Sequence, residues 1–303
     1  MRFPKNLSSM THVRKVGIAA VGGLLLSFVV LYGDVISKLV SDWATDDNFS
    51  HGFLIVPIAL YFVYERRRAL ATAAHRPSLL GLLLIVGSVA TLLAGVLGAE
   101  LFLTRVSMLG VIGGTVLYVL GWRHLQILAF PIGFLLLMIP IPAVVFNQIA
   151  FPLQLLASRF GQWALELCRI PVLREGNVIV LATTTLEVAE ACSGIRSLIS
   201  LLTLGVVYAY FTDPRSLVRV AITATTIPIA IIANGLRVAG TGVAAHHIGA
   251  EAAQGFFHSF SGWLVFLFAG VMLFATTRML LWMAPSRPES SGAPAAPLVE
   301  AAE

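Results

Sequence analysis

Three side chains with complementary chemistry stand at the ends of different apolar segments of this sequence. Cys192 and His258 each precede an apolar run, and Arg237 follows another. A thiolate is a strong nucleophile, and a neutral imidazole can take a thiol proton and return it to a leaving amine. A guanidinium can donate N–H groups to a developing oxyanion. Together the three groups would suffice for thiol-based acyl transfer.

Each of these residues alone has an ordinary structural explanation. A lone cysteine often packs as a small apolar residue. An arginine at the end of a membrane span extends its charge toward lipid headgroups, and a histidine beside aromatic residues suits the membrane interface. The chemical reading gains weight because three complementary groups come from three different segments at one expected membrane depth. Their spacing in the sequence does not show that they meet.

Further polar residues near the three groups could bind or orient a substrate. These are Glu190, Ser193 and Arg196 around the thiol, Asn234 before Arg237, and His51 at the start of another apolar run. Two alternatives stay open: His246 or His247 could replace His258 as the base, and Ser259 or Ser261 could act as a serine nucleophile. The sequence has no Walker loop, no G-x-G-x-x-G, no H-E-x-x-H and no Cys/His metal cluster. We therefore expect neither a metal nor a cofactor.

The elements that position these residues follow from composition. Hydrophobic residues make up 58% of the 303 residues, charged residues only 12%, and the mean hydropathy is +0.89. Soluble domains carry about 25% charged residues, so lipid must be the solvent for most of this chain. Long continuous apolar runs favour helices over a barrel. We predict an all-α polytopic membrane protein with about eight transmembrane helices, near 16–36, 51–64, 79–99, 102–121, 125–140, 194–211, 217–236 and 259–280.

The region between the fifth and sixth predicted spans is less regular. Residues 146–169 have an amphipathic pattern that favours a helix at the membrane interface, and short β-prone runs separated by turn residues follow. We expect 141–191 to form a small cap on the outer face. Residues 1–284 are predicted to be one integral membrane domain, and 285–303 a disordered cytoplasmic tail.

The basic residues suggest an orientation. The net charge is +5. If eight helices span the membrane and both termini face the cytoplasm, most of the 20 Lys and Arg residues lie on the cytoplasmic side, as is usual for membrane proteins. Most of the acidic residues and all three chemical groups then face outward, whereas a different span count would invert the second half. No dense basic run contains interleaved aromatic residues, so we expect no nucleic-acid partner.

The motifs resemble those of one membrane family. The run Glu190-Ala191-Cys192-Ser193-Gly194-Ile195-Arg196-Ser197, then Asn234-Gly235-Leu236-Arg237 and His258, is similar to the exosortase/archaeosortase family. Ser50-His51-Gly52-Phe53-Leu54 also resembles its N-terminal pattern, and the resemblance covers about residues 20–283.

The resemblance implies a membrane-embedded cysteine transpeptidase or protease at the periplasmic face of a bacterial inner membrane. Its substrates would be exported proteins with a C-terminal PEP-CTERM-type signal: a Pro-Glu-Pro motif, one transmembrane helix and a basic end. Cys192 would form a thioester that an amine or water resolves, with His258 as acid and base. Arg237 would hold the substrate or oxyanion, and Asn234 would orient it.

Other function classes make different demands on the sequence. A transporter needs ionisable residues near the bilayer midplane and often has inverted repeats, neither of which is evident. A non-catalytic scaffold linked to envelope polysaccharide assembly would need none of the three chemical groups. The enzyme and the scaffold are therefore distinguished by substituting those residues.

Overall fold

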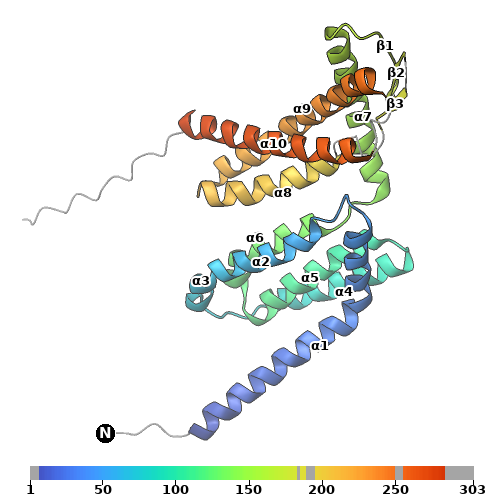
Figure 1. The fold of residues 1–303 in the computed structure, drawn as a ribbon. Helices are drawn as coiled ribbons and strands as arrows, with labels where there is room; N and C mark the ends of the chain where they lie inside the picture. Colours follow the sequence, from blue (N-terminus) through green and yellow to red (C-terminus); the bar gives the residue numbers. More distant parts are fainter. Residues whose placement is uncertain (1–6, 183–184, 189–194, 250–254, 284–303) are drawn as a thin grey trace, which may run out of the picture. The chain divides into compact units, whose positions relative to one another are not determined.

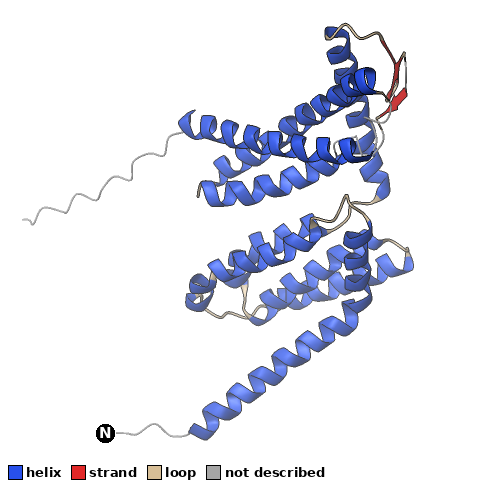
Figure 2. Cartoon of the chain, viewed as in Figure 1, coloured by secondary structure: helices blue, strands red, loops and turns tan. Residues whose placement is uncertain are grey.

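The computed structural model describes residues 7–182, 185–188, 195–249 and 255–283, which are mostly helical (Figures 1 and 2). The chain divides into two compact units, residues 1–148 and 149–303. Each unit is described by itself below. The tail predicted for 285–303 lies outside the described residues, and the prediction of one membrane domain stays a prediction.

The first unit consists of helices joined by short turns. They are α1 (Leu7–Thr45), α2 (Gly52–Glu65), α3 (Arg67–Thr72), α4 (Leu80–Leu97), α5 (Leu101–Val119), α6 (Trp122–Phe134) and the 3-10 helix η1 (Leu135–Met138). Helix α7 (Ala143–Leu167) begins in this unit and continues into the second. Pro140 and Pro142 separate η1 from α7, because proline lacks the N–H that would continue the helical hydrogen bonds.

Small residues let α4 and α5 pack as a close antiparallel hairpin. A methyl group at Gly81 would lie 2.2 Å from the backbone nitrogen of Tyr118, and one at Gly95 would lie 2.8 Å from the Thr104 side chain. Such close approach is typical of helices that associate in lipid, where burial of apolar area supplies no driving force.

The turns at the other end of this hairpin also depend on glycine. Gly121, between α5 and α6, has a φ of 95° and lies against the Arg76 backbone, which pairs with it as an isolated bridge. A methyl group there would lie 2.0 Å from the Arg76 carbonyl oxygen, so only glycine fits. This contact brings Arg76 next to the start of α6.

Polar side chains tie α1 to the rest of the first unit. Buried Trp43 donates from Nε1 to the Met138 carbonyl at 2.8 Å, and the Tyr32 and Ser107 hydroxyls are 3.1 Å apart. A buried Arg105 in α5 also pairs with Asp42 in α1. Each of these contacts satisfies a polar group that burial would otherwise penalise.

The second unit contains the rest of α7, a small sheet, α8 (Ile195–Thr212), α9 (Ser216–Ile248) and α10 (Gly255–Met283). Strands β1 (Val172–Glu175), β2 (Val178–Leu181) and β3 (Thr185–Glu187) form an antiparallel sheet in sequence order. Gly176 and Asn177 make the two-residue turn between β1 and β2, and Gly176 has a φ of 65°. The expected short β runs therefore form three strands, and the amphipathic segment is helix α7.

One buried cluster joins this sheet to α7 and α9. It contains Ala157 and Leu165 of α7, Ile179 and Leu181 of β2, and Val238 of α9. The inward-facing residues of β2 alternate with less buried ones, as in a sheet with one covered face. The sheet is thereby fixed against α9, the helix that carries Asn234 and Arg237.

The prediction of an all-α polytopic membrane protein is confirmed in the described residues, while the count of eight spans stays a prediction. Five described helices are long and apolar enough to cross a membrane: Val21–Thr45, Leu80–Leu97, Leu101–Val119, Ser216–Ile248 and Gly262–Met283. A sixth is added if Trp122–Met138 and Ala143–Leu167, which are bent by 76°, form one span. The expected spans at 51–64 and 194–211 correspond to the shorter apolar helices Gly52–Glu65 and Arg196–Thr212.

Candidate functional site

The structure describes only part of the predicted site. Glu190, Cys192 and Ser193 lie outside the described residues. His258 falls in the first turns of α10, but its side chain is also outside the described part. The site is therefore built from Asn234, Arg237 and the helices that begin next to the undescribed residues.

Asn234 and Arg237 lie on one face of α9. They are three residues apart, so their side chains are neighbours on the helix surface. Asn234 is buried, and Arg237 is half-buried. Because Gly235 stands between them, α7 can approach closely: a methyl group at Gly235 would lie 2.6 Å from the Phe160 ring.

The guanidinium of Arg237 lies beside α10. A methyl group at Gly262 would be 3.6 Å from Arg237 Nη2 and 3.7 Å from Cζ, which is ordinary van der Waals contact. Position 258 is four residues before Gly262 in α10, about one turn away along the helix axis. The structure thus brings Arg237 to the stretch of α10 that bears His258.

The register of α8 against α9 fixes the level at which α8 begins. The two helices are antiparallel and joined by a short turn, and a methyl group at Gly205 would lie 2.3 Å from the Thr226 side chain. Both helices rise about 1.5 Å per residue. The residue ten positions before Gly205 in α8 therefore lies level with the residue ten positions after Thr226 in α9. Ile195, the first residue of α8, is accordingly level with Leu236.

A buried apolar cluster holds these three helices together. Leu201 of α8, Ile222 and Ala233 of α9, and Ala269 and Leu273 of α10 all contribute to it. Figure 1 shows α8, α9 and α10 side by side. The start of α8, Arg237 and Gly262 therefore lie near one level of the three-helix cluster. Cys192 precedes α8 in the sequence and lies outside the described residues. Half-buried Arg196 lies in the first turn of α8.

The alternative histidines lie farther along α9. His246 and His247 occupy its last turn, with ring centroids 5.0 Å apart. His246 is nine residues beyond Arg237, which corresponds to about 14 Å along the helix axis. This places the pair at a different level from the Arg237–Gly262 contact.

His51 belongs to the first unit, where it makes structural contacts. Its Nε2 is 3.1 Å from the Leu137 carbonyl oxygen of η1. The adjacent Gly52 packs so closely against Trp43 that a methyl group there would lie 2.3 Å from Trp43 Nε1. His51 thus fixes the start of α2 to η1, a role that sequence reasoning did not anticipate.

Sequence reasoning also missed the two glycines that position Arg237. Neither Gly235 nor Gly262 has a chemical group, and their role depends on helices that are distant in sequence. Small residues in apolar helices are the general signal for close packing, but they do not identify the partner helix. Among the described residues, no group of three or more His, Cys, Asp and Glu side chains could hold a metal ion.

Comparison with known proteins gives a family match. The family described as transmembrane exosortase matches residues 43–275, which is more than half of the chain. The matched range includes the Cys192 segment, Asn234, Arg237 and His258, and it extends over both units. No curated protein and no solved structure matches the chain.

Proposed function

The chain belongs to the transmembrane exosortase family, and from that premise we propose that it is a membrane-embedded cysteine transpeptidase or protease. Its substrates are exported proteins with a C-terminal PEP-CTERM-type sorting signal. The proposed location is a bacterial inner membrane, with eight spans, both termini in the cytoplasm and the site at the periplasmic face.

The chemistry proceeds in two acyl transfers. The Cys192 thiolate attacks the carbonyl carbon of the scissile amide, and His258 donates a proton to the amine as the C–N bond breaks. A thioester remains on Cys192. An acceptor amine or water then loses a proton to His258, attacks the thioester carbonyl and expels the thiolate.

Arg237 stabilises the charge that develops on the carbonyl oxygen. A guanidinium presents a planar set of N–H donors and stays protonated, so it suits an oxyanion in a site with little water. Asn234, one turn earlier on the same helix face, orients the guanidinium or the substrate. Glu190, Ser193 and Arg196 are proposed to bind or orient the substrate around the thiol.

The observation that carries this proposal is the common level of the start of α8, Arg237 and Gly262. Arg237 contacts Gly262 of α10 at the level where α8 begins, and this supports a site that Arg237 shares with Cys192 and His258. The same observation favours His258 over His246 and His247, which are about 14 Å farther along α9.

A processing assay in membranes tests the proposal, with a PEP-CTERM-tagged reporter as substrate. Cys192→Ala should abolish both cleavage and formation of a thioester-linked adduct, whereas Cys168→Ala, which removes the exposed free cysteine, should leave both unchanged. His258→Ala should slow cleavage by roughly 10²–10⁴-fold, and His246→Ala should not. Normal cleavage by Cys192→Ala would exclude the thiol mechanism and leave the serine or scaffold alternatives.

A further inference from the structure

The sheet of the second unit ends in a short strand that precedes the proposed nucleophile in the sequence. Strand β3 lies at one edge of the three-stranded sheet, and β2 is the only described strand that pairs with it (Figure 1). Cys192 follows Glu187, the last residue of β3, by five positions, and five residues of chain span at most about 18 Å. The free edge of β3 is therefore within the length of a short peptide from the thiol.

The register of β3 determines which of its backbone groups face this free edge. The Val188 N–H donates to the Asn177 carbonyl at 2.9 Å, so these two residues form one of the hydrogen-bonded pairs between β2 and β3. Hydrogen-bonded pairs alternate along antiparallel strands, and Leu186 therefore bonds to β2 in the same way. The N–H and C=O groups of Thr185 and Glu187 then point away from β2.

The two outward-facing residues are also open to solvent. Thr185 and Glu187 are exposed, whereas Leu186 packs on the buried cluster of this unit and Val188 is 2% exposed. In the described part of the chain, no hydrogen bond reaches the outward backbone groups of Thr185 or Glu187. The edge thus offers two donors and two acceptors, which are the groups that an added peptide strand would pair with.

We propose that a segment of the substrate beside the scissile amide binds in extended form to the free edge of β3. This inference rests on the function proposed above, which makes the substrate a polypeptide. Main-chain hydrogen bonds to Thr185 and Glu187 hold the segment, and an extended strand of five or six residues, about 17–20 Å long, is long enough to reach from β3 to Cys192. The edge of β1, two strands away, follows α7 instead and lies about 10 Å from β3.

Strand addition determines which positions of the substrate tolerate proline. In parallel and antiparallel pairing alike, every second residue of the added strand directs its N–H and C=O toward β3, and the residues between them direct theirs away. Proline has no N–H, so it is accepted at the outward positions and excluded from the pairing ones. When the glutamate of a Pro-Glu-Pro motif pairs with β3, both prolines of the motif stand at outward positions.

Two substitutions at one position separate the backbone donor of Glu187 from its side chain. Glu187→Ala keeps the N–H and should leave kcat/KM for a PEP-CTERM peptide within about threefold, as expected for an exposed side chain. Glu187→Pro removes the outward N–H and places a ring on the edge without removing a bond to β2. It should lower kcat/KM at least about tenfold, because both a hydrogen bond and the close approach of the peptide are lost. Equal activity of the two variants would overturn strand addition.

A pair of ester-containing peptides tests the pattern from the substrate side. Replacing the glutamate amide of the motif by an ester removes the N–H that pairs with β3 and should weaken binding about fivefold. An ester two residues after the second proline removes an N–H that points away from β3, so this control peptide should bind normally. Equal binding of the two esters would contradict the pairing of the motif with β3.

The binding measurements use the full Cys192→Ala chain in detergent micelles with a fluorescent peptide, so they do not depend on turnover. The unfolding midpoint of Glu187→Pro reports whether the fold is retained, and the ester pair decides the question without any substitution in β3. Cleavage that does not require Cys192 would contradict the proposed function. Cleavage that requires Cys192 but is insensitive to Glu187→Pro and to both esters would contradict only strand addition.

Discussion

Arg237 is positioned by residues that have no functional group of their own. Gly262 on α10 leaves space for its guanidinium, and Gly235 lets α7 pack against the helix that carries it. The position of the guanidinium is therefore sensitive to added volume on a neighbouring helix, which allows its role to be tested without substituting Arg237.

At Gly262, the size of the side chain should determine activity. Gly262→Ala adds a methyl group at ordinary contact distance and should keep processing within about threefold. Gly262→Val extends into the guanidinium and should reduce processing by roughly 10²-fold, because small displacements of catalytic groups have effects of that size. Rates of adduct formation in membranes measure both effects. Gly270→Val, on the same helix with nothing within 4 Å of the added atom, is the matched control; equal losses at both positions would contradict the positioning role.

Asp213 should make the stability of the second unit depend on acid. It precedes α9, and its ion pair with Arg215 at 2.8 Å lowers the pKa of the Asp213 carboxyl. The unfolded carboxyl titrates near pH 3.9, so the stabilisation is complete above about pH 4 and is lost as the pH falls through the lower folded value.

Unfolding midpoints in detergent between pH 7 and pH 2 check this dependence. Asp213→Asn should have a lower midpoint at pH 7 and a smaller decrease below pH 4, since the amide does not titrate. A decrease as large as that of the unsubstituted chain would show that Asp213 does not contribute to the acid effect.

At the scale of elements, α7 and α9 pack in parallel through three glycines. Methyl groups at Gly161, Gly235 and Gly242 would lie 2.7, 2.6 and 2.9 Å from side chains of the opposite helix. These contacts hold α7 and α9 together, and the sheet packs on both helices through a cluster that includes Val238, next to Arg237.

This packing predicts opposite effects for two alanine substitutions in α9. Gly235→Ala should destabilise the protein by about 1–3 kcal/mol, because the methyl group overlaps the Phe160 ring. Gly240→Ala has nothing within 4 Å and should be neutral or stabilising by up to about 1 kcal/mol through helix propensity. Denaturant titrations in mixed micelles measure both, and adding Phe160→Leu should recover part of the first loss. A neutral Gly235→Ala would show that α7 and α9 are not in this contact.

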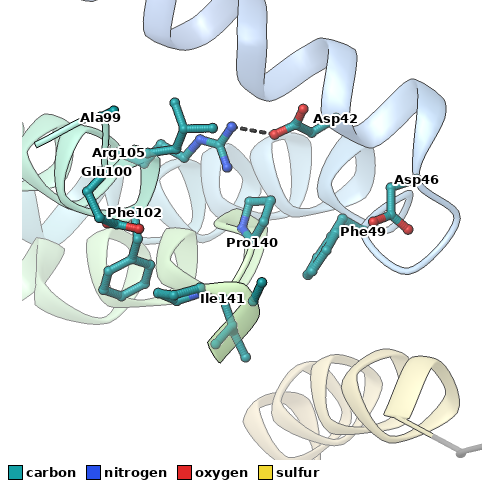
Figure 3. Close-up of a pocket in the computed structure, with 12 residues that line it drawn as sticks. Asp42, Asp46, Phe49, Ala99, Glu100, Phe102, Arg105, Pro140 and Ile141 are labelled. Atoms are coloured by element: carbon teal, nitrogen blue, oxygen red, sulfur yellow. Dashed lines mark hydrogen bonds and ion pairs between the residues drawn. The ribbon is translucent and has the colours of Figure 1, made fainter. Parts of the chain in front are cut away.

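At the scale of the whole molecule, charged side chains gather at both ends of the α4–α5 hairpin of the first unit. Asp42, Asp46 and Glu100 line a cavity together with Arg105 (Figure 3), whereas the Arg76–Gly121 contact joins the turns at the other ends of α4 and α5. Arg66 stacks over Phe130 of α6 at 5.3 Å, on the side where α2 ends. The predicted orientation, which places the basic turns in the cytoplasm, stays a prediction.

The orientation predicts which turns a membrane-impermeant maleimide reaches in intact cells. In a chain without its native cysteines, Asp47→Cys and Asn177→Cys should be labelled from outside. Ala73→Cys and Pro214→Cys should be labelled only after lysis. The pairs serve as mutual controls. The prediction requires an even number of spans between residues 47 and 177. Labelling of Asp47→Cys and Asn177→Cys from opposite sides of the membrane would show that this number is odd.

The sequence by itself showed that lipid surrounds most of the chain and that the spans are helices. It also identified the residues whose side chains could take part in catalysis. An apolar chain with few charges must satisfy its backbone internally, and this constraint is local enough to be read from continuous runs. It also gave the amphipathic segment that is α7 and the β-prone runs that form the sheet. It did not distinguish the short apolar helices at 51–64 and 194–211 from helices long enough to cross the membrane, because both kinds of helix have the same composition.

Only the tertiary structure decided which parts of the described helices lie at the same level. The contacts of Gly205 with Thr226 and of Gly262 with Arg237 set the registers of α8, α9 and α10, and nothing in the separate segments specifies them. The same holds for Arg105, whose sequence position suggests an outer-face charge but whose partner, Asp42, comes from a helix 63 residues earlier. Register and pairing arise from complementary surfaces on distant segments, so they exist only once the helices have packed.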